Sequence, residues 1–259
     1  GREFFQPSGV AVDRSSSPNR LYVSDTGNNR ILAWRDAGAW TNGQAADLVI
    51  GQPDLLTTTP GRGDSGLSQP RGLAADGSGA LYVADSANHR VLVFARPFEQ
   101  TGRVRARAAL GQSDFASFAA GLGPARLSFP AAVAIDRLGR VVVADLDNDR
   151  VVFFSQAHTG ALATVVLGQP NLTTNSGQGV PVTARLRSPV SVAVNAAGNV
   201  WVGDGEGSRV LDFGPADSLP ATGATATRLL GQSSFTERCQ IPALNCIATE
   251  VEATNLLGL

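Results

Sequence analysis

The chain has 259 residues, of which 43% are hydrophobic, and a formal net charge of −1. This length is enough for one domain with a sizeable core, and the near balance of charges is unlike that of a disordered tail or an electrostatic nucleic-acid binder. The sequence contains no Lys, which excludes a Schiff-base lysine and a phosphate-loop lysine on this chain. No stretch approaches the roughly 20 apolar residues of a membrane-spanning helix. The 29 Gly and 14 Pro residues favour many short strands joined by turns.

Four short apolar runs follow one another at the start of the chain: PSGVAVD, RLYVSD, RILAW and DLVIGQ, all within residues 6–52. Corresponding sets of runs occupy residues 69–112, 129–169 and 188–232, and residues 233–259 remain as a C-terminal loop segment. The runs are rich in Val, Ile, Leu and aromatic residues and are bounded by Gly, Asp, Asn or Pro, so they are predicted to be strands. The prolines that open the sets recur with a period of about 60 residues. They are Pro7, Pro70, Pro130 and Pro189.

Four strands in each of four repeats predict an all-β fold, a β-propeller built from four-stranded antiparallel blades. In such a blade the turn between the second and third strands and the connection to the next blade emerge on the same face. We call it the long-loop face, because the connections between blades are long. Loops of such length without their own secondary structure are uncommon and often functional. Its long segments are residues 53–69, 113–129, 170–188 and 233–259.

A spaced motif follows the second strand of the first three repeats: Asp, two residues, Asn, one residue, Arg. In the fourth repeat Gly207 replaces the Asn, while Asp204 and Arg209 remain. Together with PxGVAVD and LYVAD, this pattern resembles the NHL repeat over essentially the whole chain. The resemblance implies a propeller, most often of six blades, that serves mainly as an interaction platform, with a minority of enzymes among its relatives. The motif residues are Asp25, Asn28, Arg30, Asp85, Asn88, Arg90, Asp145, Asn148, Arg150, Asp204 and Arg209.

The number of blades in the ring has two interpretations. The four repeats either close into a small four-bladed ring or form four blades of a larger six-bladed propeller. An arc left open would expose two blade faces, and so large a patch favours self-association or a place in a longer chain.

Residues that recur in every repeat are best explained by blade construction, with Asp accepting backbone N–H groups and Arg pairing with it. Asp145, Asp147 and Asp149 alternate like the start of a calcium loop, but Arg150 and Gln156 stand where a helix-loop-helix site needs Gly and Glu. Calcium therefore remains a weak alternative, and no cofactor is predicted. Each fourth strand ends in Gly-Gln, which we expect to turn the chain and tie the following loop to its blade. The loops then carry an apolar anchor: Leu55, Phe115, Leu172 or Phe235.

Residues that break the repeat are better ligand-binding candidates, because blade symmetry does not explain them. His89 stands where the other repeats have Asn, Asp or Ser, and the repeat places Asp147, Asp149 and Glu206 near it on the long-loop face. Trp40 is a further weak candidate on this face, as an exposed aromatic contact. The tripeptide Arg62-Gly63-Asp64 matches an integrin-recognition motif, but chance matches are frequent in a chain rich in Arg and Gly. Arg103, Arg105 and Arg107 are interpreted as a solvated face, with a small anion patch as the alternative.

Two cysteines, Cys239 and Cys246, lie close together with a Pro between them, which favours a disulfide over free thiols or a metal site. A disulfide implies an oxidising location: secreted, periplasmic or at the cell surface. We expect a non-catalytic scaffold that binds a protein or a carbohydrate through the long-loop face, and no nucleic acid. The alternatives are a lyase- or lactonase-like enzyme with a metal in the central pocket, and a structural repeat of a larger extracellular assembly. No catalytic residue is assigned.

Overall fold

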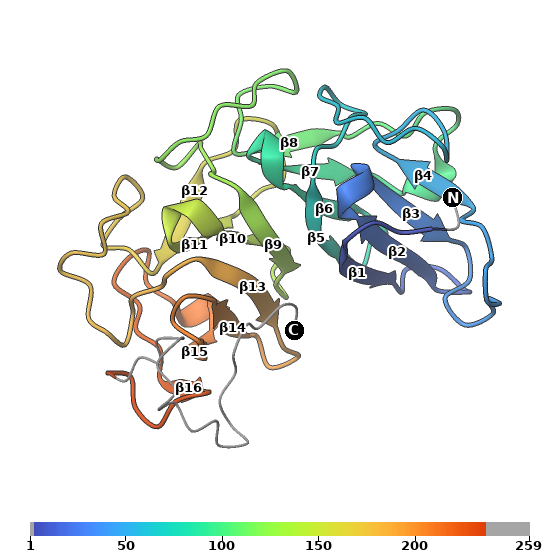
Figure 1. Cartoon of the computed structure of the whole chain (residues 1–259). Helices are drawn as coiled ribbons and strands as arrows, with labels where there is room; N and C mark the ends of the chain where they lie inside the picture. Colours follow the sequence, from blue (N-terminus) through green and yellow to red (C-terminus); the bar gives the residue numbers. More distant parts are fainter. Residues whose placement is uncertain (1–2, 237–259) are drawn as a thin grey trace.

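The computed structural model describes residues 3–236 of the chain. Within this range sixteen strands form four antiparallel sheets of four strands each, so the fold is all-β (Figure 1). The first blade comprises β1 (Pro7–Asp13), β2 (Arg20–Asp25), β3 (Arg30–Trp34) and β4 (Leu48–Ile50), and the second comprises β5 (Pro70–Ala75), β6 (Leu81–Asp85), β7 (Arg90–Phe94) and β8 (Ala108–Leu110). The third comprises β9 (Pro130–Ile135), β10 (Val141–Asp145), β11 (Arg150–Phe154) and β12 (Ala163–Leu167), and the fourth comprises β13 (Pro189–Val194), β14 (Asn199–Asp204), β15 (Arg209–Pro215) and β16 (Arg228–Leu230).

Each blade is a meander in which consecutive strands pair, with the first strand innermost and the fourth outermost. The second and third strands are the most deeply buried, because every residue of β6, β7, β10 and β11 is buried. All four inner strands line one axial cavity of about 350 Å³. They approach one another closely there, since a Cβ added to Gly72 would come within 2.5 Å of the Ala132 Cα. Glycine is therefore required where the β5 backbone packs against β9.

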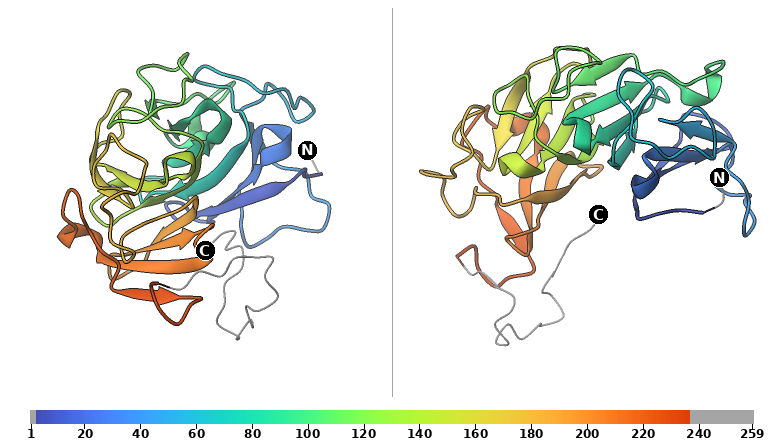
Figure 2. Two further views of the ribbon diagram at one scale, coloured as in Figure 1. Left: turned by 60° about the vertical axis from the view of Figure 1, so that its left-hand side comes forward. Right: turned by 45° about the horizontal axis from the view of Figure 1, so that its top comes forward.

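Three apolar clusters hold consecutive blades together: one between the first and second blades, one between the second and third, and one between the third and fourth. A smaller cluster lies on the outer face of the first blade alone. Across residues 3–236 no cluster joins the fourth blade to the first, and Figures 1 and 2 show the blades as an open arc with these two at its ends. The described residues thus do not form the closed four-bladed ring that was one of the two expected arrangements.

Candidate functional site

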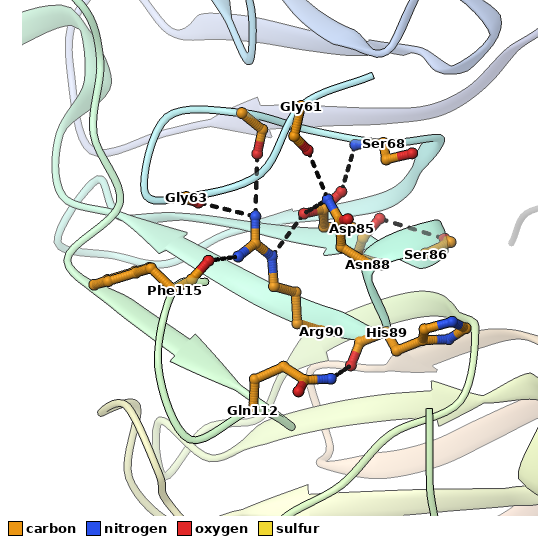
Figure 3. Close-up of polar contacts among 12 residues, drawn as sticks. Gly61, Gly63, Ser68, Asp85, Ser86, Asn88, His89, Arg90, Gln112 and Phe115 are labelled. Atoms are coloured by element: carbon orange, nitrogen blue, oxygen red, sulfur yellow. Dashed lines mark hydrogen bonds and ion pairs between the residues drawn. The ribbon is translucent and has the colours of Figure 1, made fainter. Parts of the chain in front are cut away.

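The repeated Asp–Asn–Arg motif forms a buried ion-pair cluster, shown for the second blade in Figure 3. Asp85 Oδ1 accepts the backbone N–H of Ser68 at 2.7 Å, and its Oδ2 accepts Arg90 Nε at 2.8 Å and Asn88 Nδ2 at 2.9 Å. Asp85 and Arg90 are both 0% exposed. Burial raises the pKa of Asp85, against the opposing effects of Arg90 and the other donors. The charges are compensated by one another and by backbone groups, as buried charges must be.

The guanidinium of Arg90 also holds two long loops in place. Its NH1 donates to the Phe115 carbonyl at 2.6 Å in the loop that leaves the blade, and its NH2 donates to the Gly63 carbonyl at 2.9 Å in the loop that enters it. Arg30, Arg150 and Arg209 repeat the arrangement, each binding its Asp through Nε at 2.7 to 2.9 Å. The NH1 acceptors of these three are the carbonyls of Leu55, Leu172 and Phe235, the residues expected to anchor the loops.

A second contact joins successive blades on the long-loop face. The residue after each β2–β3-type turn has a left-handed backbone, with φ near 52° at Asn29, His89 and Asp149. The side chain of each accepts the backbone N–H of the residue before the next blade's opening Pro. Asn29 Oδ1 accepts from Gln69 at 2.9 Å, His89 Nδ1 from Phe129 at 3.0 Å and Asp149 Oδ1 from Ser188 at 2.7 Å.

The Gly-Gln pair performs the structural role expected of it. Gln112 Nε2 donates to the carbonyls of His89 and Ala119, both at 3.0 Å, so it ties the loop after β8 to the turn between β6 and β7 (Figure 3). Gly111 has a φ of +82°, and a Cβ there would lie 2.6 Å from the Leu127 side chain. A positive φ and a close neighbour together favour glycine at this position.

The candidate residues of the long-loop face fall into two adjacent pairs. Asp147 is an electrostatic neighbour of His89, and the pKa of His89 is lowered because burial outweighs the carboxylates beside it. Ser188 connects the other pair, because its N–H binds Asp149 Oδ1 at 2.7 Å and its hydroxyl donates to Glu206 Oε1 at 3.2 Å. Burial raises the pKa of the Asp149 carboxyl, and the charges of Glu206 and Asp147 add to this effect.

Trp40 is not part of this group. It lies between β3 and β4, in a connection at the opposite end of the strands from the β2–β3 turn, so its placement on the long-loop face was wrong. The strand order is sufficient to show this. The turn between β2 and β3 lies on the long-loop face, so the connection between β3 and β4 lies on the opposite face. Trp40 instead lines a groove with Phe4, Leu21 and Trp34 on the outer face of the first blade.

The three carboxylates of the calcium hypothesis do not converge. Asp145 accepts Ser128 N–H, Asn148 Nδ2 and Arg150 Nε at 2.6 to 2.8 Å, and Asp149 is engaged by the next blade. Burial raises the pKa of Asp145 to about 6, with Arg150 acting in the opposite direction. No group of three or more His, Cys, Asp or Glu side chains arranged for a metal ion occurs in the part of the chain that the structure describes.

The Arg-Gly-Asp tripeptide contacts other segments of the chain through its charged side chains. The Arg62 guanidinium lies 3.3 Å from the centroid of the Phe118 ring, and Arg105 donates to both oxygens of Asp64 at 2.9 Å. Arg103 and Arg107 also bind backbone carbonyls of other segments. These arginines tie blades and loops together, and both charged side chains of the tripeptide have intramolecular partners.

A polar pocket of about 310 Å³ opens on the long-loop face between the third and fourth blades. Two carboxylates, Asp149 and Glu206, and two guanidiniums, Arg185 and Arg187, line it together with Gln169 and Asn175. Within residues 3–236 no ion pair of 4.0 Å or less joins these charges, and the buried Nε of Arg185 has no hydrogen-bond partner. Sequence reasoning identified the carboxylates and missed the arginines. The available signal was Arg187, which stands where the preceding repeats have Ser68 and Ser128.

Cys239 and Cys246 lie outside the described residues, so the expected disulfide stays a prediction. A search of the described residues for a helix long and apolar enough to cross a membrane finds none.

Comparison with known proteins identifies one repeat directly. Residues 67–94, which contain Asp85, Asn88 and Arg90, match the NHL repeat. NHL repeat-containing protein 2 of Bos taurus is 38% identical over 90 residues, which are 33% of this chain and 10% of that protein. NHL repeat-containing protein 3 of Mus musculus is 27% identical over 150 residues, 54% of this chain and 40% of that protein. The matches thus span less than half of either curated relative.

A solved structure of a nidogen/laminin complex has the same fold. It superposes with a TM-score of 0.52 at 17% identity, over 88% of this chain and 69% of that chain.

Proposed function

Because this chain carries the NHL repeat in a β-propeller fold, we propose that it is a non-catalytic scaffold that binds a protein partner through the long-loop face. The polar pocket between the third and fourth blades is the centre of the proposed site. The observation that carries the proposal is the presence of Arg187 and Glu206 in this pocket at positions where the second blade has Ser68 and Ala87. Arg187 breaks the repeat, since the third blade also has Ser at this position, whereas Glu206 corresponds to the acidic Asp147 of the third blade. Blade construction does not require either charge, because the second blade has neither.

The long loops around the pocket are held in fixed positions, which favours binding. Each motif Arg binds carbonyls of the loops before and after its blade, and each Gln binds the preceding turn. A loop held in this way loses less conformational entropy when a partner binds. The scaffold therefore presents its charges from a preorganised frame.

The chemistry of the pocket favours a charged polypeptide surface over a sugar. Among the described residues that line it there is no aromatic side chain, whereas there are charges of both signs with no ion-pair partner in this set. Such charges give specificity and orientation when a partner offers complementary ones. A partner segment with both acidic and basic side chains fits this pattern.

The proposal is tested by selecting from a displayed random-peptide library on the purified protein, followed by titration of the enriched peptides. The matched variant is Arg187→Ser with Glu206→Ala, which returns both positions to the residues of the second blade. Arg14→Ser is the control, because Arg14 lies in the exposed β1–β2 turn at the other end of the blade. We expect peptides of mixed charge whose affinity falls at least about tenfold in the double variant and is unchanged in the control.

Peptides that bind all three proteins equally would place recognition elsewhere. If a glycan array gives hits that the double variant loses, the partner is a carbohydrate. Turnover of a screened substrate would overturn the non-catalytic assignment.

A further inference from the structure

Among residues 3–236 the blades pack by one repeated rule, which leaves one blade face at each end of the arc without a neighbouring blade. We call the face of a blade that packs on the preceding blade its trailing face, and the opposite one its leading face. The trailing face of the second blade is apolar and closed, because Leu81, Val83, Leu92 and Phe94 are 0% exposed against the first blade. The corresponding trailing-face residues of the first blade are Leu21, Val23, Leu32 and Trp34, and within residues 3–236 no blade packs on them.

This first trailing face remains apolar and partly open. Phe4 packs against Trp34 with ring centroids 6.1 Å apart, so the blade covers part of the face itself. Val10 is nevertheless 65% exposed, Val12 40% and Trp40 57%. A groove of about 300 Å³ lies between Trp34 and Trp40. The equivalent positions on the second and third strands are buried in the second blade. An exposed apolar surface of this kind is typical of an interaction site.

The leading face of the fourth blade has different chemistry. One cross-strand pair on the leading face is apolar in the first three blades: Ala33 with Leu48, Val93 with Ala108, and Phe153 with Val165. In the fourth blade this pair is Asp212 with Arg228. Arg228 Nε donates to Asp212 Oδ2 at 2.8 Å, and its guanidinium lies over the Trp201 ring at 5.4 Å. The Arg228 side chain is 62% exposed, so packing another blade here would remove a charge from water.

We propose that the trailing face of the first blade is the interface of a homodimer, in which two copies of this chain join first blade to first blade. Head-to-tail association would bury Arg228 against Val10 and Trp40, whereas two copies of the apolar face meet without desolvating a charge. The contact repeats the chemistry of the three interfaces inside the arc, and a two-fold arrangement closes on itself instead of growing into a filament. The charged pair on the fourth blade then opposes polymerisation.

Sedimentation velocity over a concentration series tests the interface. Val10→Glu places a carboxylate on the exposed part of the trailing face, and Leu138→Glu is the matched control, because Leu138 is 62% exposed in the turn after β9. We expect a monomer–dimer equilibrium that Val10→Glu weakens at least about tenfold and Leu138→Glu leaves unchanged. Thermal unfolding confirms that each variant is folded. If Val10→Glu does not fold, Trp40→Ser replaces it, since Trp40 lies in a loop outside the strands.

A second variant tests the role of the charged pair. Asp212→Val with Arg228→Ala recreates the apolar pair of the second blade and should produce species larger than a dimer. Wild-type protein that stays monomeric at every concentration would overturn the proposal, as would a dimer that is insensitive to Val10→Glu. A dimer disrupted by Arg228→Glu and by Val10→Glu alike would show head-to-tail association and overturn it too.

Discussion

The backbone N–H of Phe129 donates a hydrogen bond to Nδ1 of His89 at 3.0 Å and thereby links the third blade to the second. The acceptor is a ring nitrogen, so the imidazole must be neutral and carry its proton on Nε2. Asn29 and Asp149 make the equivalent contact in their blades with side-chain oxygens. His89 is therefore the one of these three acceptors that protonation near neutral pH would remove.

The first prediction concerns pH. The pKa of His89 is lowered by burial, so the folded state prefers the neutral ring. Its contribution to stability is fully present above the unfolded pKa of about 6.5 and is lost as the pH falls through the lower folded value. We expect the difference in unfolding free energy between the wild type and His89→Asn to shift against the wild type on acidification. Denaturant titrations at several pH values measure this difference.

Asn suits the comparison because it occupies the same left-handed position in the first blade and offers a neutral oxygen acceptor. The carboxylates with raised pKa values remain in both proteins, so their contributions cancel in the difference. Parallel pH profiles for the two proteins would show that this contact does not titrate.

A second prediction tests the buried ion pair. Removing the guanidinium with Arg90→Met leaves the Asp85 carboxylate buried without its cation and frees the carbonyls of Phe115 and Gly63. We expect a loss of about 3–5 kcal/mol in unfolding free energy. Arg105→Met breaks the exposed pair with Asp64 and should cost no more than about 1 kcal/mol. Equal losses in equilibrium unfolding would contradict the structural role assigned to the motif.

The third prediction concerns the Gly-Gln pair. Gln112→Ala removes the two donors that join the loop after β8 to the preceding turn. The two carbonyls would lose their partners in a partly buried place, so we expect a cost of about 1–3 kcal/mol. Gln178→Ala, at an exposed loop position, is the control. Hydrogen exchange should show faster exchange in residues 113–129 of the first variant, and unaltered exchange there would argue against the tie.

The fourth prediction separates steric contact from backbone strain. Gly111→Ala and Gly102→Ala both place a side chain at positive φ, but only the first would meet a neighbour, the Leu127 side chain. We expect Gly102→Ala to cost about 1 kcal/mol and Gly111→Ala distinctly more. Adding Leu127→Ala relieves the contact, so a double-mutant cycle should be non-additive. Additive losses would mean that strain alone accounts for the glycine.

The repeats made most of the fold predictable from the sequence. The apolar runs, with the Gly, Asp, Asn or Pro residues that bound them, predicted where the strands lie. The recurring Asp and Arg indicated a structural pair, because binding of one asymmetric ligand cannot explain four copies of the motif. The arc could not be predicted in the same way. Whether the first and last blades meet depends on the curvature set by close contacts such as that of Gly72 with Ala132, which no local pattern encodes.

Two features of the candidate site could be recognised only in the structure. His89 breaks the repeat in residue type but keeps the repeat's contact, since an imidazole nitrogen accepts the same N–H that Asn and Asp accept elsewhere. Sequence comparison sees the change of residue and not the shared geometry. Arg185 was missed for a different reason: it aligns with Arg126 of the third repeat, so it does not break the repeat and did not stand out as a ligand-binding candidate.

The acceptors that fix the long loops are main-chain carbonyls, a property with evolutionary consequences. In two successive loops the held carbonyls have the same spacing: Leu55, Thr59, Gly61 in one and Phe115, Ala119, Gly121 in the next. Side chains between these points can mutate without disturbing the path of the chain. The loop before the fourth blade departs from this spacing, and it lines the charged pocket. Selection can therefore diversify recognition on this face while the framework beneath it is inherited unchanged.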